Sequence, residues 1–152
     1  MMRASGVWAL FLVAAFAAST VAVAWEAKAD RPAAEPVEPS MHEFMEYVFE
    51  PSFKRLKSAM ATAPADNAGW KAIKGDSLSL AEAGNLLLLR KADEHDAEWA
   101  ELSAQVRSLG GQLYTAARKK DYPTARKHYE AMVVKCNACH SKFAGGEHQL
   151  KP

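Results

Sequence analysis

The chain has 152 residues, of which 49% are hydrophobic and 24% are charged. This length and composition fit one globular domain and leave no comfortable room for a second. With 19 Lys and Arg residues against 18 Asp and Glu residues, the net charge of +1 excludes the general positive field on which nucleic-acid binding depends. Any charged docking surface must therefore be local.

The N-terminus has the pattern of an export signal. Arg3 gives a positive start, residues 6–25 carry no charge, and residues 22–24 read Ala-Val-Ala, a small-x-small pattern suited to signal peptidase. We interpret residues 1–24 as a signal peptide whose removal leaves a soluble periplasmic protein. About 20 uncharged residues rise roughly 30 Å as a helix, so an uncleaved segment would instead anchor the chain in the membrane. Both alternatives place the folded part outside the cytoplasm.

The sequence divides the rest of the chain into three parts. Residues 25–40 contain three prolines and no apolar periodicity, which predicts a flexible tether. Residues 41–145 are expected to form the folded domain. Residues 146–152 follow Gly145 and are expected to be a frayed tail.

Four amphipathic helices are predicted in the domain. The first follows an N-cap at Ser40, and Pro51 predicts a kink or separately set first turns within it. A turn over residues 64–69 precedes the second helix, in which Gly75 and Asp76 are a candidate interruption. The four apolar stripes consist of Met45, Phe49, Phe53, Leu56 and Met60; of Trp70, Ile73, Leu80, Gly84, Leu87 and Leu88; of Trp99, Leu102, Val106, Leu109, Leu113 and Ala116; and of Ala125, Tyr129, Met132, Cys136, Cys139 and Phe143.

Capping residues and a basic run mark the ends of the last two predicted helices. Asp93 is the expected cap of the third helix, which ends at the basic residues 118–120, and Asp121 with Pro123 opens the fourth. Runs of alternating β-branched residues are absent and the turns are short, so the most economical fold is all-α, an antiparallel up-down-up-down four-helix bundle. The helices alone would also fit a generic helical adaptor without any site.

The two cysteines carry the functional signal. Residues 136–140 read Cys-Asn-Ala-Cys-His, the C-x-x-C-H signature of c-type haem attachment. On a helix, positions i, i+3 and i+4 share one side of a turn. Cys136 and Cys139 can therefore hold a porphyrin edge by two thioethers while the His140 imidazole reaches the iron. Export strengthens this interpretation, because c-type haem is attached outside the cytoplasm.

Three other interpretations of the cluster remain open. A structural zinc site would need a distant fourth ligand. A thioredoxin-like redox pair would sit between a strand and a helix, and no strand pattern precedes Cys136. The third is a plain disulfide between Cys136 and Cys139.

The sequence resembles the class II c-type cytochromes, the cytochrome c-prime family. An export signal, four helices and one C-x-x-C-H close to the C-terminus, followed by Phe143, carry the resemblance over roughly residues 40–143. In class I cytochromes c the motif lies near the N-terminus. The resemblance implies a left-handed four-helix bundle with one covalent haem c, His140 as the proximal iron ligand and a distal ligand from the first helix. It also allows a homodimer.

The same resemblance suggests candidates for the distal ligand. Laying residues 42–45 on the family pattern puts His42 in the distal position, which implies six-coordinate, low-spin iron. Met45 is an alternative that would raise the reduction potential, because a thioether favours ferrous iron more than an imidazole does. Met41 is a third candidate, and an open or water-bound site is the remaining one. Many family members carry an Arg shortly before the distal residue, whereas residues 38–40 here read Glu-Pro-Ser.

Other side chains receive simpler interpretations. The histidines His95, His128 and His148 are expected on the surface. Trp70, Trp99, Tyr114 and Tyr129 are expected in the core or the pocket lining. Six cations are expected either to be solvated or to form a basic rim near the haem edge for an acidic redox partner: Lys119, Lys120, Arg126, Lys127, Lys135 and Lys142.

Together these features predict a periplasmic one-electron carrier that exchanges electrons with other redox proteins. Enzyme activity is not indicated, because no second acid–base group is visibly paired with the pocket. One alternative is a five-coordinate haem protein that binds NO or CO, with Phe44 or Phe49 over the iron. The other is a haem-free helical interaction module with a disulfide between Cys136 and Cys139.

Overall fold

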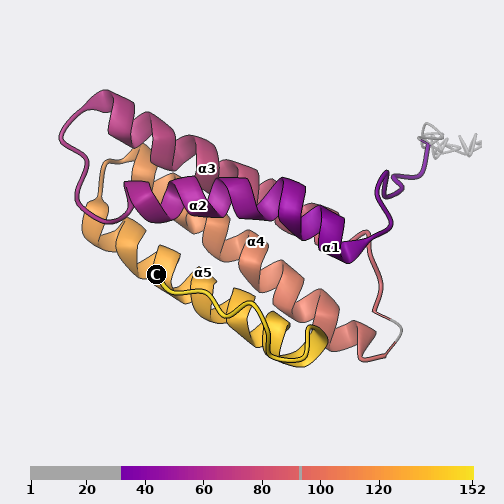
Figure 1. The fold of residues 1–152 in the computed structure, drawn as a ribbon. Coiled ribbons are helices and arrows are strands. Elements are labelled where there is room, and N and C mark those ends of the chain that lie inside the picture. The colour runs from indigo at the N-terminus through magenta and orange to yellow at the C-terminus, as the bar shows by residue number, and fades with distance from the viewer. Residues whose placement is uncertain (1–31, 93) are drawn as a thin grey trace, which may run out of the picture. The chain divides into compact units, whose positions relative to one another are not determined.

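The computed structural model describes residues 32–92 and 94–152, and within this part of the chain all regular structure is helical, without strands (Figure 1). The helical elements are α1 (Met41–Phe44), the π-helical turn η1 (Met45–Phe49), α2 (Glu50–Ala59), α3 (Asn67–Leu87), α4 (Asp96–Arg118) and α5 (Tyr122–Phe143). This confirms the all-α prediction and is compatible with an antiparallel four-helix bundle. The signal peptide expected at residues 1–24 lies outside the described residues. None of the helices in the described part combines the length and hydropathy of a membrane span.

The elements α1, η1 and α2 follow one another without a break and form the first helical segment. Its predicted cap is confirmed, because the Ser40 hydroxyl accepts a hydrogen bond from the Glu43 backbone N–H at 3.3 Å. In η1, the Glu50 N–H bonds to the carbonyl of Met45, five residues back. Pro51 lies in the first turn of α2, where its ring would conflict with the carbonyl four residues earlier in a regular helix. The predicted irregularity at Pro51 therefore takes the form of a wider, π-helical turn.

Helix α3 runs without interruption through Gly75 and Asp76, so the candidate interruption there does not occur. Asp76 does not interrupt the helix because its side chain is buried against α2, where its Oδ1 accepts hydrogen bonds from Arg55 Nε at 2.9 Å and Arg55 Nη2 at 2.6 Å. A glycine in a helix interior costs only about 1 kcal/mol. The long apolar face of α3 outweighs that cost.

The starts of α4 and α5 differ in how they are capped. Asp121 caps α5 as predicted, because its Oδ1 accepts from the Thr124 N–H at 3.1 Å. Helix α4 begins at Asp96, after His95 in a left-handed conformation with φ of 59°. Asp93, the expected cap, lies outside the described residues.

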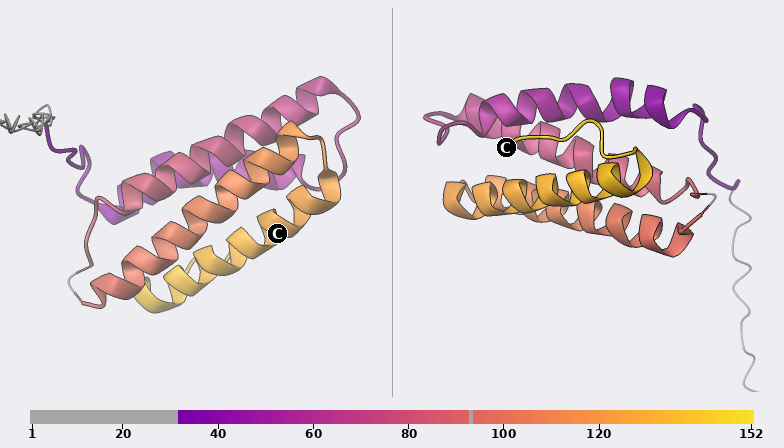
Figure 2. Two further views of the ribbon diagram at one scale, coloured as in Figure 1. Left: turned by 180° about the vertical axis from the view of Figure 1, so that it is seen from behind. Right: turned by 60° about the horizontal axis from the view of Figure 1, so that its bottom comes forward.

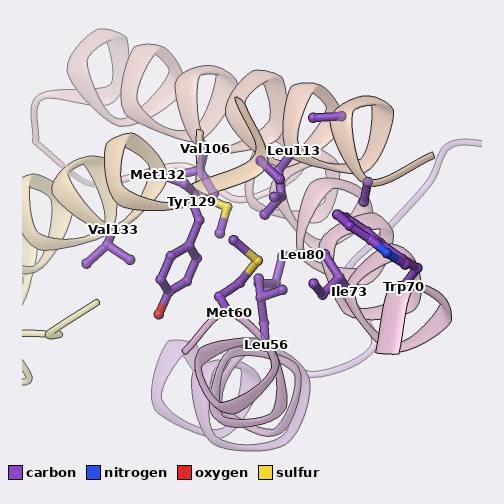
Figure 3. Packing of buried hydrophobic residues seen from close by; sticks show 13 residues of the cluster. Leu56, Met60, Trp70, Ile73, Leu80, Val106, Leu113, Tyr129, Met132 and Val133 are labelled. Atoms are coloured by element: carbon purple, nitrogen blue, oxygen red, sulfur yellow. The ribbon is translucent and has the colours of Figure 1, made fainter. Parts of the chain in front are cut away.

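Two apolar clusters fill the interior. The smaller one contains Phe44, Leu87 and Trp99 and lies at the end of the bundle that carries Cys139. Trp70, Trp99 and Tyr129 are buried as predicted, whereas Tyr114 is only half-buried, with the Arg118 guanidinium 5.9 Å from its ring centre. The larger cluster is drawn in Figure 3 and comprises Leu56, Met60, Trp70, Ile73, Leu80, Val106, Leu113, Ala116, Ala117, Ala125, Tyr129, Met132 and Val133.

Helices α2 and α5 meet through side chains at one end of the bundle. There the Tyr122 hydroxyl donates to the Met60 carbonyl at 2.8 Å, Arg126 Nη1 donates to the same oxygen at 2.7 Å, and the Phe53 ring stacks on Tyr129. The backbones of α2 and α5 do not come into contact, whereas α2 with α3, α3 with α4, and α4 with α5 pack directly.

The sequence predicts a frayed tail at residues 146–152; in the structure residues 147–152, called the C-terminal tail below, turn back along α5 (Figure 2). Gly145 and Gly146 have φ of 63° and 81°, a left-handed conformation that reverses the chain. Lys57 of α2 donates to the Lys151 carbonyl at 2.8 Å, and Leu150 packs against the larger cluster. The tail is ordered because its backbone groups find partners on α2 and α5.

The close contact between α3 and α4 yields a test of the packing. A Cβ added at Gly84 would lie 2.9 Å from the Arg107 Cα, whereas one added at Gly75 would meet nothing within 4 Å. We expect Gly84→Ala to lower the free energy of unfolding by about 1–2 kcal/mol, because overpacking exceeds the gain in helix propensity. Gly75→Ala, the matched control, should raise it by about 0.5–1 kcal/mol. Urea denaturation measures both, and effects of the same sign would contradict the packing described.

Candidate cofactor site

A cavity of about 510 Å³ lies between the first helical segment and the C-terminal half of α5. Its volume falls within the range of small-molecule and cofactor sites, and its wall is mainly apolar. The wall is formed by all four helical segments and by the tail: Met41, His42, Met45, Glu46, Phe49, Glu50, Phe53, Leu80, Leu87, Trp99, Leu102, Ser103, Val106, Met132, Cys136, Cys139, His140, Phe143, Ala144, His148 and Leu150.

The structure brings Cys136, Cys139 and His140 together on this wall, as the sequence predicts. Helix α5 is continuous through all three residues, so their i, i+3 and i+4 spacing places them on one side of a turn. The two thiols are free and not joined to each other. Two sulfur atoms and one imidazole therefore reach the same apolar space.

The electrostatic state of the thiols bears on the alternatives. Burial raises the pKa of the Cys136 thiol to about 12 and that of Cys139 to about 11, and the neighbouring Cys139 adds to the shift at Cys136. Both thiols are protonated at neutral pH. A thioredoxin-like redox pair requires a lowered thiol pKa, so the raised values disfavour that interpretation. They do not bear on a zinc site, because a bound Zn²⁺ itself deprotonates its thiol ligands.

The His140 imidazole is poised to act as a metal ligand. Its Nδ1 lies 2.9 Å from the backbone carbonyl oxygen of His148. Because a carbonyl only accepts, Nδ1 must carry the proton of this hydrogen bond, which leaves Nε2 unprotonated in the neutral ring. Burial lowers the pKa of His140, although the bond to the His148 carbonyl acts in the opposite direction. A neutral imidazole with one nitrogen held by a carbonyl is the usual form of a metal-ligating histidine.

All three candidates for the distal ligand lie on the cavity wall. The side chain of His42 is 75% exposed, and its Nε2 lies 3.5 Å from a carboxylate oxygen of Glu46. Met41 and Met45 are half-buried and pack against the smaller apolar cluster. His42 therefore lies at the mouth of the cavity and is the most exposed of the three.

Sequence reasoning missed Ser103, which lines the cavity from α4. Its side chain is buried, and its hydroxyl has no hydrogen-bond partner in the described part of the chain. A buried hydroxyl without a partner is unfavourable, so this group fits a wall that receives a polar atom of a ligand or a water molecule. The sequence offers one signal for Ser103. It is a polar residue on the apolar face of its helix, four residues after Trp99 and three before Val106.

None of the six cations lines the cavity, and this includes Lys135, although it directly precedes Cys136. Lys119, Lys120, Arg126 and Lys127 lie near the start of α5, and about 20 Å of helix separates Tyr122 from Cys136. Lys142, at the other end, pairs with Glu98 of α4 at 3.0 Å. Among the described residues, those that line the cavity include Glu46 and Glu50 but no Lys or Arg.

Two of the other three histidines lie on the surface, as the sequence predicts, and one of these two, His148, also lines the cavity. His95 and His148 are exposed and His128 is half-buried outside the cavity wall.

Comparison of the sequence with models of protein families and with curated proteins gives no match in either case.

The raised thiol pKa values can be tested on the chain without haem. A pKa of about 11 in place of 9.0 leaves Cys139 with about 100-fold less thiolate at pH 8. We therefore expect alkylation by iodoacetamide at pH 8 to be at least about 100-fold slower in the folded chain than in urea, because only the thiolate reacts. The rate should rise about tenfold per pH unit up to pH 11. Rapid alkylation at pH 7 would instead favour a redox-active pair.

Proposed function

We propose that this chain is a c-type cytochrome that carries one electron, with haem c attached to Cys136 and Cys139 and with His140 as the proximal iron ligand. The observation that carries the proposal is that these three side chains share one mainly apolar cavity of about 510 Å³, in which His140 keeps Nε2 free. When bound, the haem supplies an iron centre that accepts and releases one electron.

The residues of the cavity fit this group. Each cysteine S–H would add across one vinyl group of the porphyrin, so that a carbon–sulfur bond forms and the thiol proton passes to the other vinyl carbon. No atom leaves, and no oxidant is required. The apolar wall suits the macrocycle, and the Ser103 hydroxyl offers one polar partner. Since no Lys or Arg lines the described cavity, the two haem carboxylates would have to face water at its mouth.

The neighbouring side chains would hold the ligands still during electron transfer. Trp99 and Phe143 pack edge to face, with ring centres 5.2 Å apart, beside Cys139. The Trp99 indole N–H donates to the Leu87 carbonyl at 3.0 Å, which fixes the ring against α3. A stiff wall of this kind limits the rearrangement that accompanies a change of redox state.

The charge at the mouth bears on the redox partner. Glu46 and Glu50 are exposed and line the cavity, and His42 lies beside Glu46. A partner that approaches this edge would therefore fit better with a basic face than with the acidic face that a basic rim would attract. We place the partner in the periplasm, on the strength of the export signal in residues 1–24.

A second candidate function is the binding of a small gas at an open iron site. It is supported by the 75% exposure of the His42 side chain, while Phe49 lines the cavity from the same helical segment. Phe44, the other residue considered for this role, does not line the cavity, because its ring packs under the Arg90 guanidinium at 3.7 Å.

Haem attachment is tested directly on the exported protein. We expect the pyridine haemochrome spectrum of a c-type haem, and a mass equal to the mature chain plus one haem. Cys136→Ser with Cys139→Ser should abolish both signals, because no thioether can form. Ala138→Ser, at an exposed position of the same motif, is the matched control and should retain them. A colourless wild-type protein with the mass of the bare chain would refute the proposal.

The distal ligand separates the two candidate functions. For the electron carrier we expect a low-spin ferric EPR spectrum that becomes high-spin in His42→Ala, while Met41→Leu and Met45→Leu remain low-spin. An unchanged spectrum in His42→Ala would remove His42 from the coordination sphere. A high-spin wild-type spectrum, together with rapid CO binding by the reduced protein, would instead establish the gas-binding candidate.

A further inference from the structure

The C-terminal tail forms hydrogen bonds with the C-x-x-C-H turn itself. Asn137, which occupies an x position of the motif, donates from Nδ2 to the Leu150 carbonyl at 2.9 Å and accepts at Oδ1 from the Leu150 N–H at 2.7 Å. One side-chain amide therefore satisfies both backbone groups of a residue 13 positions away. Leu150 is half-buried and lines the cavity, so the tail is held at its wall.

The same tail reaches the proximal imidazole. Between the reversal at Gly145 and Gly146 and the clamp on Leu150, the His148 carbonyl accepts the hydrogen bond of His140 Nδ1–H at 2.9 Å. His148 has φ of 58°, a left-handed conformation that costs a non-glycine residue free energy. A conformation of this kind persists only where its surroundings hold it. Leu150 lies two residues after His148 in the tail, and its two hydrogen bonds to the Asn137 side chain supply that restraint.

We propose that Asn137 is a positioning residue for the proximal ligand: its clamp on Leu150 holds the His148 carbonyl against His140 and so fixes the tautomer and orientation of the imidazole. The inference rests on the proposed function, in which His140 binds the haem iron. A carbonyl that accepts from Nδ1–H makes Nε2 a stronger electron donor. Because a stronger donor stabilises ferric iron, the clamp lowers the reduction potential.

The test on the exported holoprotein compares three variants. Asn137→Ala removes the clamp, a deletion of residues 147–152 removes the tail, and Lys151→Ala is the matched control, because it changes an exposed tail side chain and keeps the backbone carbonyl. We expect the first two to shift the equilibrium about tenfold toward ferrous iron, which is about 59 mV for a one-electron couple. In the His42→Ala background, where the reduced iron would be five-coordinate, the iron–histidine stretching frequency should fall in both, and Lys151→Ala should leave it unchanged.

These readouts separate positioning from a merely structural role. If Asn137 and the tail only stabilised the fold, their loss would lower the melting temperature without changing the reduction potential or the iron–histidine frequency. If Asn137→Ala and the tail deletion both keep the wild-type values of these two quantities, the proposal is overturned. The haem content of each variant is measured alongside, so that the comparison is made at equal occupancy.

A second measurement does not depend on haem. In the full chain without haem, ¹⁵N NMR of the His140 ring should report the Nδ1–H tautomer, and Asn137→Ala should move the population toward Nε2–H. An exported wild-type protein without haem would refute the proposed function, while this tautomer shift would still support the clamp. An Nε2–H ring in the wild type, or no change in Asn137→Ala, would overturn the clamp whatever the haem content.

Discussion

The site depends on the first helical segment and α5 being joined at one end of the bundle only. Near Met60 they are joined by Tyr122 and Arg126, which both donate to one carbonyl, and by the stack of Phe53 on Tyr129. Toward the opposite end nothing comparable joins them in the described part of the chain, and the cavity lies there. An apolar cavity of this size costs free energy as long as the surrounding side chains cannot collapse into it. A ligand that fills it would therefore stabilise the fold as well as confer function.

The C-terminal part of α5 and the C-terminal tail hold each other in place through hydrogen bonds. The tail has little apolar surface of its own beyond Leu150, so it lies against the bundle only because Asn137, His140 and Lys57 pair with its backbone. In return, the tail shields one side of His140 and defines the state of Nδ1. His140 and the groups that hold its ring thus lie within a short stretch of sequence, but they meet only because the chain reverses at Gly145 and Gly146.

Local signals account for what could be predicted from the sequence. The caps at Ser40 and Asp121, the apolar stripes of the last three helices and the spacing of Cys136, Cys139 and His140 depend on neighbours within a few residues. The features that were missed depend on partners far along the chain. Asp76 continues α3 because Arg55 lies across from it, and the tail is ordered because Asn137 bonds Leu150. The sequence shows Ser103 as a polar residue on an apolar helix face. Only the fold shows that its unpaired hydroxyl lines the cavity.

The first helical segment shows how one proline changes which side chains reach the site. A π turn holds one more residue than an α turn, which rotates everything before it by about 100° relative to a regular helix. A single 3.6-residue stripe running from Met45 through Phe53 therefore cannot describe the whole segment. Consistent with this, Phe44 is buried, although the stripe omitted it, while Met45 is only half-buried. Because Pro51 lies two residues after this turn, its ring helps to decide which side chains of the segment, among them His42, Met45 and Phe49, reach the cavity.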